Sequence, residues 1–185
     1  MNLKIVMLFA FALLWMVACE NKNSKTEETE NTQKLRKILT DPLVYDATII
    51  AELVHINHGL SAILDQISAA DSLGILREYN TTKVLLDEGI EKLKDLPTLD
   101  GNVDYKGAAL NIMNFHRKAM DSQYKRIVEI SVKKNPSEKE EEERETLYEQ
   151  MENVEEDLDD RFFRVRDAFG KQNNIKLPNN GDVKL

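Results

Sequence analysis

The sequence predicts an all-α protein, an antiparallel up-down-up-down four-helix bundle behind a signal peptide and a disordered tether. Three observations support this prediction. Glycine and proline are scarce, at 7 and 4 of 185 residues, which disfavours the many tight turns of an all-β chain. Apolar residues recur at helical spacing in four long segments. Short polar connections with capping residues separate these segments, as expected for antiparallel neighbours.

Residues 1–18 have the layout of a secretion signal. Lys4 supplies a positive charge, and residues 5–17 form an unbroken apolar run of 13 residues. A membrane-spanning helix needs roughly 17–25 apolar residues, so this run is short enough to be the apolar region of a signal peptide. Ordinary secretion with cleavage nearby and an uncleaved anchor helix are the alternatives.

The stretch Met16-Val17-Ala18-Cys19 resembles the lipobox of bacterial lipoprotein precursors, with Met16 where Leu is usual. The resemblance implies cleavage before Cys19, a diacylglyceryl group on its sulfur, and acyl chains such as palmitate that hold the protein at a membrane. Stable anchoring needs more than one acyl chain, at about 0.8 kcal/mol per buried CH₂. Residues 19–41 then form a lipidated, flexible tether, because residues 20–33 have no apolar face to bury.

Cysteine count and net charge exclude several classes of function. Cys19 is the only cysteine, so the chain cannot form an internal disulfide or a zinc site with several thiolate ligands. If Cys19 carries lipid, no thiol is left to act as a catalytic nucleophile. The formal charge is −8, and removing residues 1–18 takes away one lysine, Lys4. Nucleic acid is therefore not an expected partner, because phosphate binding requires a Lys- and Arg-rich face.

The bundle is expected over residues 42–172, followed by a polar tail at 173–185. Its four helices are predicted at about 42–70, 72–96, 104–133 and 137–171. Asp41 with Pro42, Asp71 and Asp104 are the expected N-terminal signals of the first three helices. Ser137 and Glu140 match the S-x-x-E capping box at the start of the fourth. A three-helix arrangement, with the first two helices fused at Asp71, is the alternative.

Three polar residues fall inside the apolar stripes and form the candidate site. His116 lies at the centre of the third stripe, Gln123 shares its face two turns later, and Asn57 lies inside the first stripe. Buried polar groups must hydrogen-bond each other or water, and such a layer can fix the register of helices. The alternative is a small-ligand or haem pocket, with Met120 or Met151 as an axial ligand. The chain has no CxxCH motif for covalent haem attachment.

Other motifs do not predict a metal or catalytic site. Glu52-x-x-His55 has the spacing of a di-iron ligand pair, but no second E-x-x-H is present, and the helical wheel places both residues toward solvent. His58 makes an i, i+3 pair with His55 that would bind a divalent ion only incidentally. Residues 100–104 start like a calcium loop and then lack its glycine. We therefore expect no metal ligands, no cofactor and no catalytic residues.

Residues 43–177 resemble an uncharacterised family of helical lipoproteins of Gram-negative bacteria, which includes a leptospiral surface-protein family. Three segments carry the resemblance: residues 45–50, residues 105–125, and residues 167–177. These are patterns of helix packing. The resemblance implies a cell-envelope location and a helical bundle, and it provides no activity for any residue of this chain.

These observations predict a lipid-anchored, non-enzymatic binding or structural module that contacts an envelope component through exposed acidic helices. The anchor points to the outer membrane, on its periplasmic or its surface face, and the oligomeric state is open. A periplasmic ligand carrier that uses Asn57, His116 and Gln123 is the alternative, and an enzyme is the third possibility.

Overall fold

The structure is a computed structural model that describes residue 32 and residues 40–99 and 103–178. The chain divides into two compact units, Met1–Lys37 and Ile38–Leu185, and every helix named below belongs to the second. The predicted signal peptide, Cys19 and most of the predicted tether lie outside the described residues.

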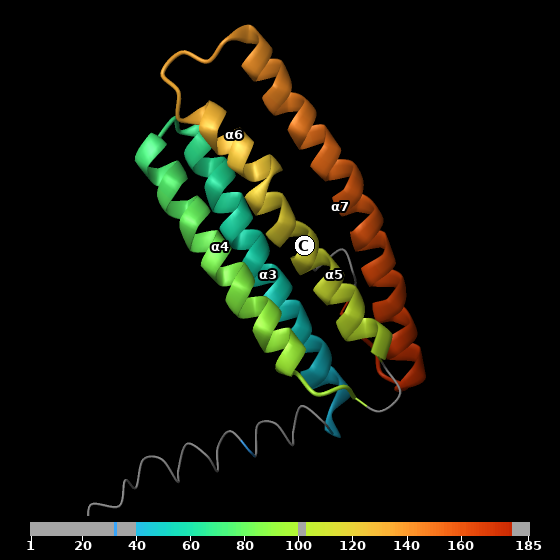
Figure 1. Cartoon of the computed structure of the whole chain (residues 1–185). Helices are drawn as coiled ribbons and strands as arrows, with labels where there is room; N and C mark the ends of the chain where they lie inside the picture. The colour runs from blue at the N-terminus through green and yellow to red at the C-terminus, as the bar shows by residue number, and fades with distance from the viewer. Residues whose placement is uncertain (1–31, 33–39, 100–102, 179–185) are drawn as a thin grey trace, which may run out of the picture. The chain divides into compact units, whose positions relative to one another are not determined.

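The described part of the second unit is all-helical, which confirms the predicted fold class (Figure 1). The described residues contain no strand. The helices are α3 (Pro42–Ser68), α4 (Ser72–Asp95), α5 (Val103–Asp121), α6 (Gln123–Ser131) and α7 (Glu138–Gln172).

Capping residues start three of the helices where the sequence predicts. The Asp41 side chain accepts hydrogen bonds from the backbone N–H groups of Leu43 and Val44, with Pro42 at the first helical position. Asp71 caps α4, and Ser137 with Glu140 forms the complete capping box of α7. The prediction that Asp104 is the N-cap of the next helix is wrong. Helix α5 begins at Val103, so Asp104 lies in the first turn, where its charge favours the helix dipole.

A tight turn separates α3 from α4 and rules out the fused three-helix alternative. Ala70 adopts a left-handed conformation with φ of 54°, and the Asp71 N–H donates to the Gln66 carbonyl at 3.1 Å. This is the hydrogen-bonding pattern that ends many helices, usually with glycine at the left-handed position. The chain therefore reverses direction within three residues although no glycine or proline is present.

The predicted third helix, 104–133, is interrupted at Ser122, which has φ of −129° and ψ of −87°. The Tyr79 hydroxyl of α4 donates to the Met120 carbonyl at 2.6 Å. In a continuous helix this carbonyl would accept a hydrogen bond from a backbone N–H one turn later. The Ser122 hydroxyl donates to the Lys118 carbonyl at 2.9 Å. Helices kink where side-chain groups hydrogen-bond to backbone carbonyls that would otherwise accept from the helix backbone, and both of these hydrogen bonds lie next to Ser122. The interruption divides the segment into α5 and α6.

Helix α4 runs antiparallel to α3 and to α5, and α7 runs antiparallel to α5 and α6, because residue numbers fall along one helix as they rise along its neighbour. This is the order expected of the predicted up-down bundle. The pairs are Glu52–Lys92 and Gly59–Thr82 between α3 and α4, Lys94–Lys106 and Asp87–Arg117 between α4 and α5, and His116–Glu155 and Arg126–Glu143 between α5–α6 and α7.

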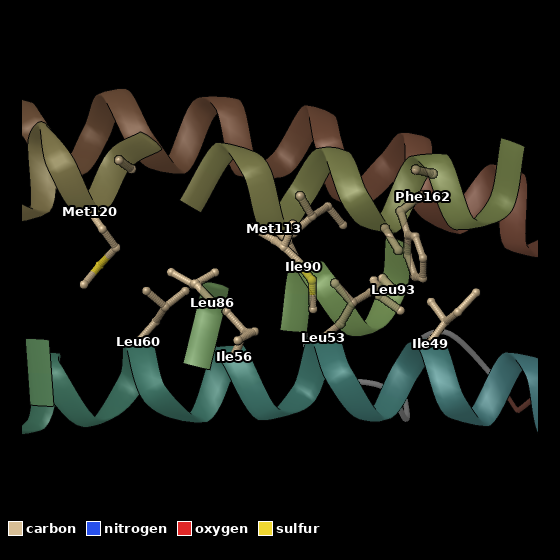
Figure 2. Packing of buried hydrophobic residues seen from close by; sticks show 14 of the residues in the cluster. Ile49, Leu53, Ile56, Leu60, Leu86, Ile90, Leu93, Met113, Met120 and Phe162 are labelled. Carbon is tan, nitrogen blue, oxygen red and sulfur yellow. The ribbon is translucent and has the colours of Figure 1, made fainter. Parts of the chain in front are cut away.

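The core is formed by one apolar face of each helix. Figure 2 shows Ile49, Leu53, Ile56 and Leu60 of α3 projecting toward the side chains of α5. Helix α3 is also the one described helix whose length and apolarity would allow it to cross a membrane. Core helices meet the same criterion, and α3 buries seven residues in the bundle.

The predicted polar tail at 173–185 is only partly a tail. Asn174 takes a left-handed conformation with φ of 53° just after α7, and the Ile175 N–H donates to the Gly170 carbonyl at 3.0 Å. This turn directs Ile175 and Leu177 back onto the core. A Cβ on Gly170 would lie 3.0 Å from Leu177, so glycine here allows the close approach rather than ending the helix.

Candidate functional site

A cleft of about 110 Å³ lies where α3, α5, α6 and α7 meet. Its walls are mostly apolar, and its polar groups come from Asn57 and Ser61 of α3, His116 of α5, Tyr124 of α6, and Glu155 and Asp159 of α7. Leu64 of α3 is 40% exposed and lines the cleft. The cleft brings together two of the three predicted site residues, Asn57 and His116.

His116 is the buried polar group of this cleft. His116 is only 8% exposed, and its Nδ1 has no hydrogen-bond partner among the described residues. Burial lowers the pKa of His116 to about 4, so the imidazole is neutral at neutral pH. The ring of Phe115 contacts it edge-on, with the ring centroids 5.3 Å apart. A buried nitrogen without a partner is costly to keep, which makes it a candidate for ligand contact.

Two carboxylates of α7, those of Glu155 and Asp159, line the cleft together with the imidazole. Oε1 of Glu155 lies 3.6 Å from Nδ1 of His116, too far for a hydrogen bond, and the neutral imidazole forms no ion pair with it. Burial and the charges of Asp159 and Glu152 raise the pKa of Glu155. Burial and the charge of Asp160 raise the pKa of Asp159. Both carboxylates therefore lie in surroundings that disfavour their charge, and a cation in the cleft would relieve this.

Gln123 does not line the cleft, and Tyr124 takes its place. A continuous helix would put Gln123 on the face of His116, but the interruption at Ser122 shifts the helical phase beyond it. Tyr124 is 5% exposed, and burial with the charge of Glu155 raises the pKa of its hydroxyl. Of the predicted layer of Asn57, His116 and Gln123, the structure therefore places the first two at the cleft and Gln123 outside it.

The remaining motifs lie elsewhere. His55 and His58 are exposed on α3, and Glu52 pairs with Lys92 at 3.3 Å. In the part of the chain that the structure describes, no group of three or more His, Cys, Asp or Glu side chains could hold a metal ion. Most of the predicted calcium-like loop, residues 100–102, lies outside the described residues.

The cleft does not fit a haem. Met120 and Met151, the two possible axial ligands with His116, are buried in the core but do not line the cleft. Pockets for ligands of drug size or larger have volumes of roughly 300–1,000 Å³, well above that of this cleft. The lining suits a group of a few heavy atoms.

A second buried polar centre lies at the other end of the bundle. Arg166 of α7 is fully buried and binds the 3%-exposed Asp46 through two hydrogen bonds, from Nε at 2.7 Å and from Nη2 at 2.9 Å. The Tyr105 hydroxyl donates to the same carboxylate at 2.5 Å, and Arg166 Nη1 donates to the Pro178 carbonyl at 3.2 Å. Asp46, Tyr105, Arg166 and the Pro178 carbonyl are thus hydrogen-bonded to one another. This buried centre joins α3, α5, α7 and the segment after α7, and its role is structural.

Helix α7 carries an acidic segment, residues 149–160, with seven carboxylates and no lysine or arginine. Earlier acids of α7 are paired: Glu143 with Arg126 at 2.7 Å, and Glu141 with Arg144 at 2.5 Å. Among the described residues, none of the seven carboxylates forms an ion pair with a lysine or arginine, and Glu155 faces only neutral His116. The acidic segment therefore has uncompensated negative charge along one edge of the cleft.

Comparison of the chain with protein-family models, curated proteins and solved structures found no match.

Ser61, Tyr124, Glu155 and Asp159 are the polar cleft residues that sequence reasoning missed. Glu155 and Asp159 are four residues apart and flank Leu158, which belongs to the apolar stripe of α7, so their spacing was a usable signal. Tyr124 follows His116 at an interval of eight residues, which also fits one helix face. The interruption at Ser122 determines that Tyr124, and not Gln123, lines the cleft. A hydrogen bond from Tyr79 of another helix lies at this interruption.

Proposed function

We propose that this protein is a lipid-anchored lipoprotein of the bacterial cell envelope that binds a cationic partner through α7 and has no enzymatic activity. The uncompensated charge of the acidic segment, residues 149–160, supports this proposal. Burial raises the pKa values of Glu155 and Asp159, and repulsion from the other carboxylates of the segment raises them further. A cationic partner would remove the repulsion, and the field of the segment would speed its approach.

The expected anchor is Cys19, and residues 19–41 are the expected spacer. A flexible coil of 15–20 residues spans roughly 20–27 Å on average, which would hold the bundle clear of the lipid surface. The partners in this proposal are the membrane, through the lipid, and a basic envelope protein or ligand. The outer membrane is the expected location, on its periplasmic or its surface face.

Labelling cells with radioactive palmitate tests the anchor. The wild-type chain should incorporate label and sediment with membranes, whereas Cys19→Ala should lose both properties. Label retained by Cys19→Ala would refute lipidation at this residue. Protease treatment of intact cells, with and without outer-membrane permeabilisation, distinguishes the two faces of the membrane.

Cross-linking in intact cells with mass-spectrometric identification tests the contact surface. A variant with Glu152→Gln, Glu156→Gln and Asp160→Asn should lose partners that the wild-type chain captures. The matched control, with Asp65→Asn, Glu88→Gln and Glu142→Gln, makes the same change in charge at exposed, unpaired acids elsewhere and should keep those partners. Equal loss in both variants would show that net charge, rather than the acidic segment, governs capture.

A second candidate function is the binding of a small ligand in the cleft, and the unpartnered Nδ1 of His116 favours it. If His116 only sets helix register, His116→Leu should fold normally and lose nothing that copurifies with the wild-type protein. Loss of a copurifying small molecule in a folded His116→Leu variant would make ligand binding the function of the cleft.

A further inference from the structure

The polar groups of the cleft are complementary to a donor of hydrogen bonds that carries positive charge. Carboxylates only accept hydrogen bonds, and a neutral imidazole accepts at one nitrogen and donates at the other. Glu155 and Asp159 therefore offer acceptors, and His116 Nδ1 offers one when the proton is on Nε2. No lysine or arginine lines the cleft. An anionic ligand would meet two like charges and no counter-charge.

The spacing of the acceptors suits an ammonium group. His116 Nδ1 and Glu155 Oε1 are 3.6 Å apart, and an ammonium carries three N–H donors on one nitrogen. One ammonium nitrogen can therefore donate to both atoms at ordinary hydrogen-bond lengths. A bulkier guanidinium is planar and presents its donors in a fixed fork, which matches one carboxylate better than this mixed pair.

The apolar walls of the cleft suit a narrow aliphatic chain. Leu53, Ile56 and Leu60 line one side and Met113 lies opposite, so methylene groups would be removed from water along their length. The volume of about 110 Å³ leaves no room for a ring system of porphyrin size. The flexible thioether of Met113 can adapt to chains of slightly different length.

We infer that this cleft binds a primary ammonium group on an unbranched aliphatic stem, with the ammonium between His116 Nδ1 and the Glu155 carboxylate and the stem against the apolar wall of α3. This inference rests on the second candidate function above and names its ligand class. A free aliphatic amine and a lysine side chain of a protein partner share this chemistry. Asp159, four residues beyond Glu155, adds a second carboxylate for the other amine of a diamine.

Calorimetric titration of the full-length mature lipoprotein in non-ionic detergent tests the inference, with 1,5-diaminopentane and n-pentylamine as ligands and n-pentanol as the uncharged control. Both amines should bind and pentanol should not. Glu155→Gln should weaken amine binding about tenfold or more, since a hydrogen bond to a charged group contributes at least that factor. The control variant Glu142→Gln, which removes one exposed acid from the first turns of the same helix, should bind amines as the wild-type protein does.

The imidazole provides a readout that needs no variant. The chain has three histidines, and His55 and His58 are exposed, so their ring ¹⁵N signals serve as internal references. Adding the amine should shift the His116 Nδ1 signal toward that of a hydrogen-bonded acceptor and leave the other two unchanged. This measurement keeps the inference testable if His116→Leu fails to fold.

The two sources of the ammonium are separated by a third ligand, a short peptide with a single lysine and blocked ends. Tighter binding of the peptide than of pentylamine identifies a lysine of a protein partner, and the reverse order identifies a free amine. Absence of binding at about 10 mM amine, where a complex with a 1 mM dissociation constant would be about nine-tenths formed, overturns the inference. Binding that is equally strong in Glu155→Gln also overturns it. Partners that are still cross-linked through the acidic segment in that case would leave the primary proposed function standing.

Discussion

Substituting Asp46 by asparagine removes the negative charge opposite Arg166 and tests how far this buried centre determines stability. Asparagine keeps the shape of the side chain, so the change leaves the Arg166 guanidinium buried beside a neutral amide. Arg166 is 0% exposed and Asp46 is 3% exposed, and two hydrogen bonds of 2.7 and 2.9 Å join them. Solvent therefore cannot replace the lost carboxylate.

The expected cost is about 3–5 kcal/mol, the usual penalty for removing one partner of a buried ion pair. A domain of this size is stable by about 5–15 kcal/mol in total, so Asp46→Asn should be folded but markedly weakened. The melting temperature should fall by about 6–20 °C, since 1 kcal/mol corresponds to about 2–4 °C in a domain of 150–250 residues. Urea and thermal unfolding followed by far-ultraviolet circular dichroism measure both quantities.

A double-mutant cycle separates the ion pair from its surroundings. The double variant Asp46→Leu with Arg166→Met removes both charges together, and it should be more stable than Asp46→Leu alone or Arg166→Met alone, because apolar replacement of a buried pair is often neutral. Glu91→Gln, at the exposed i, i+3 pair with Lys94, is the control and should change stability by less than about 1 kcal/mol. The ion-pair argument is refuted if Asp46→Asn costs no more stability than Glu91→Gln, or if the costs of Asp46→Leu and Arg166→Met simply add in the double variant.

Four further substitutions test individual features of the structure. Ala70→Gly should stabilise the domain by about 1 kcal/mol, seen as a higher melting temperature, because φ of 54° strains alanine but not glycine. Gly59→Ala should destabilise it by about 1–3 kcal/mol, because the new Cβ would lie 2.9 Å from the Thr82 hydroxyl, whereas Gly107→Ala, with nothing within 4 Å, should stabilise it by up to about 1 kcal/mol. Urea unfolding of both glycine variants checks this, and similar effects at the two positions would contradict it. Burial of His116 should lower the free energy of unfolding as the pH falls from 6.5 to about 4, because the unfolded chain then binds a proton on this imidazole that the folded chain does not. The loss of stability approaches about 3 kcal/mol. Glu155 and Asp159, whose pKa values are raised, act in the opposite direction. Comparing the unfolding of wild type and His116→Leu at pH 7 and at pH 4.5 therefore isolates the imidazole, and a stability difference that does not change with pH would refute the lowered pKa of His116.

Helix starts were the most predictable part of the fold. The Asp41 cap with Pro42 and the Ser137–Glu140 capping box involve residues at most three positions apart, so the sequence alone contains both partners. The fold class follows from the helical spacing of apolar residues, which is also a local property. Asn57 and His116 could be placed in one layer because their positions along two helices follow from the lengths of the predicted helices.

Features that depend on the rotation of one helix against another were not predictable. Arg166 lies within the apolar face of α7, and a sequence reading does not place an arginine in a core unless Asp46, 120 residues earlier, is known to face it. Only the tertiary contact supplies the counter-charge that makes its burial possible.

The sequence by itself determined that the chain is all-helical, where most of its helices begin, and that Cys19 is its only cysteine and hence the only residue that could carry a thioether-linked lipid. The tertiary structure decided the composition of the cleft. The hydrogen bond from Tyr79 to Met120 joins residues 41 positions apart, and it lies at the interruption after Asp121 that turns Tyr124 rather than Gln123 toward His116. Helical periodicity describes a continuous helix, so it cannot anticipate a phase shift imposed by a side chain of another helix.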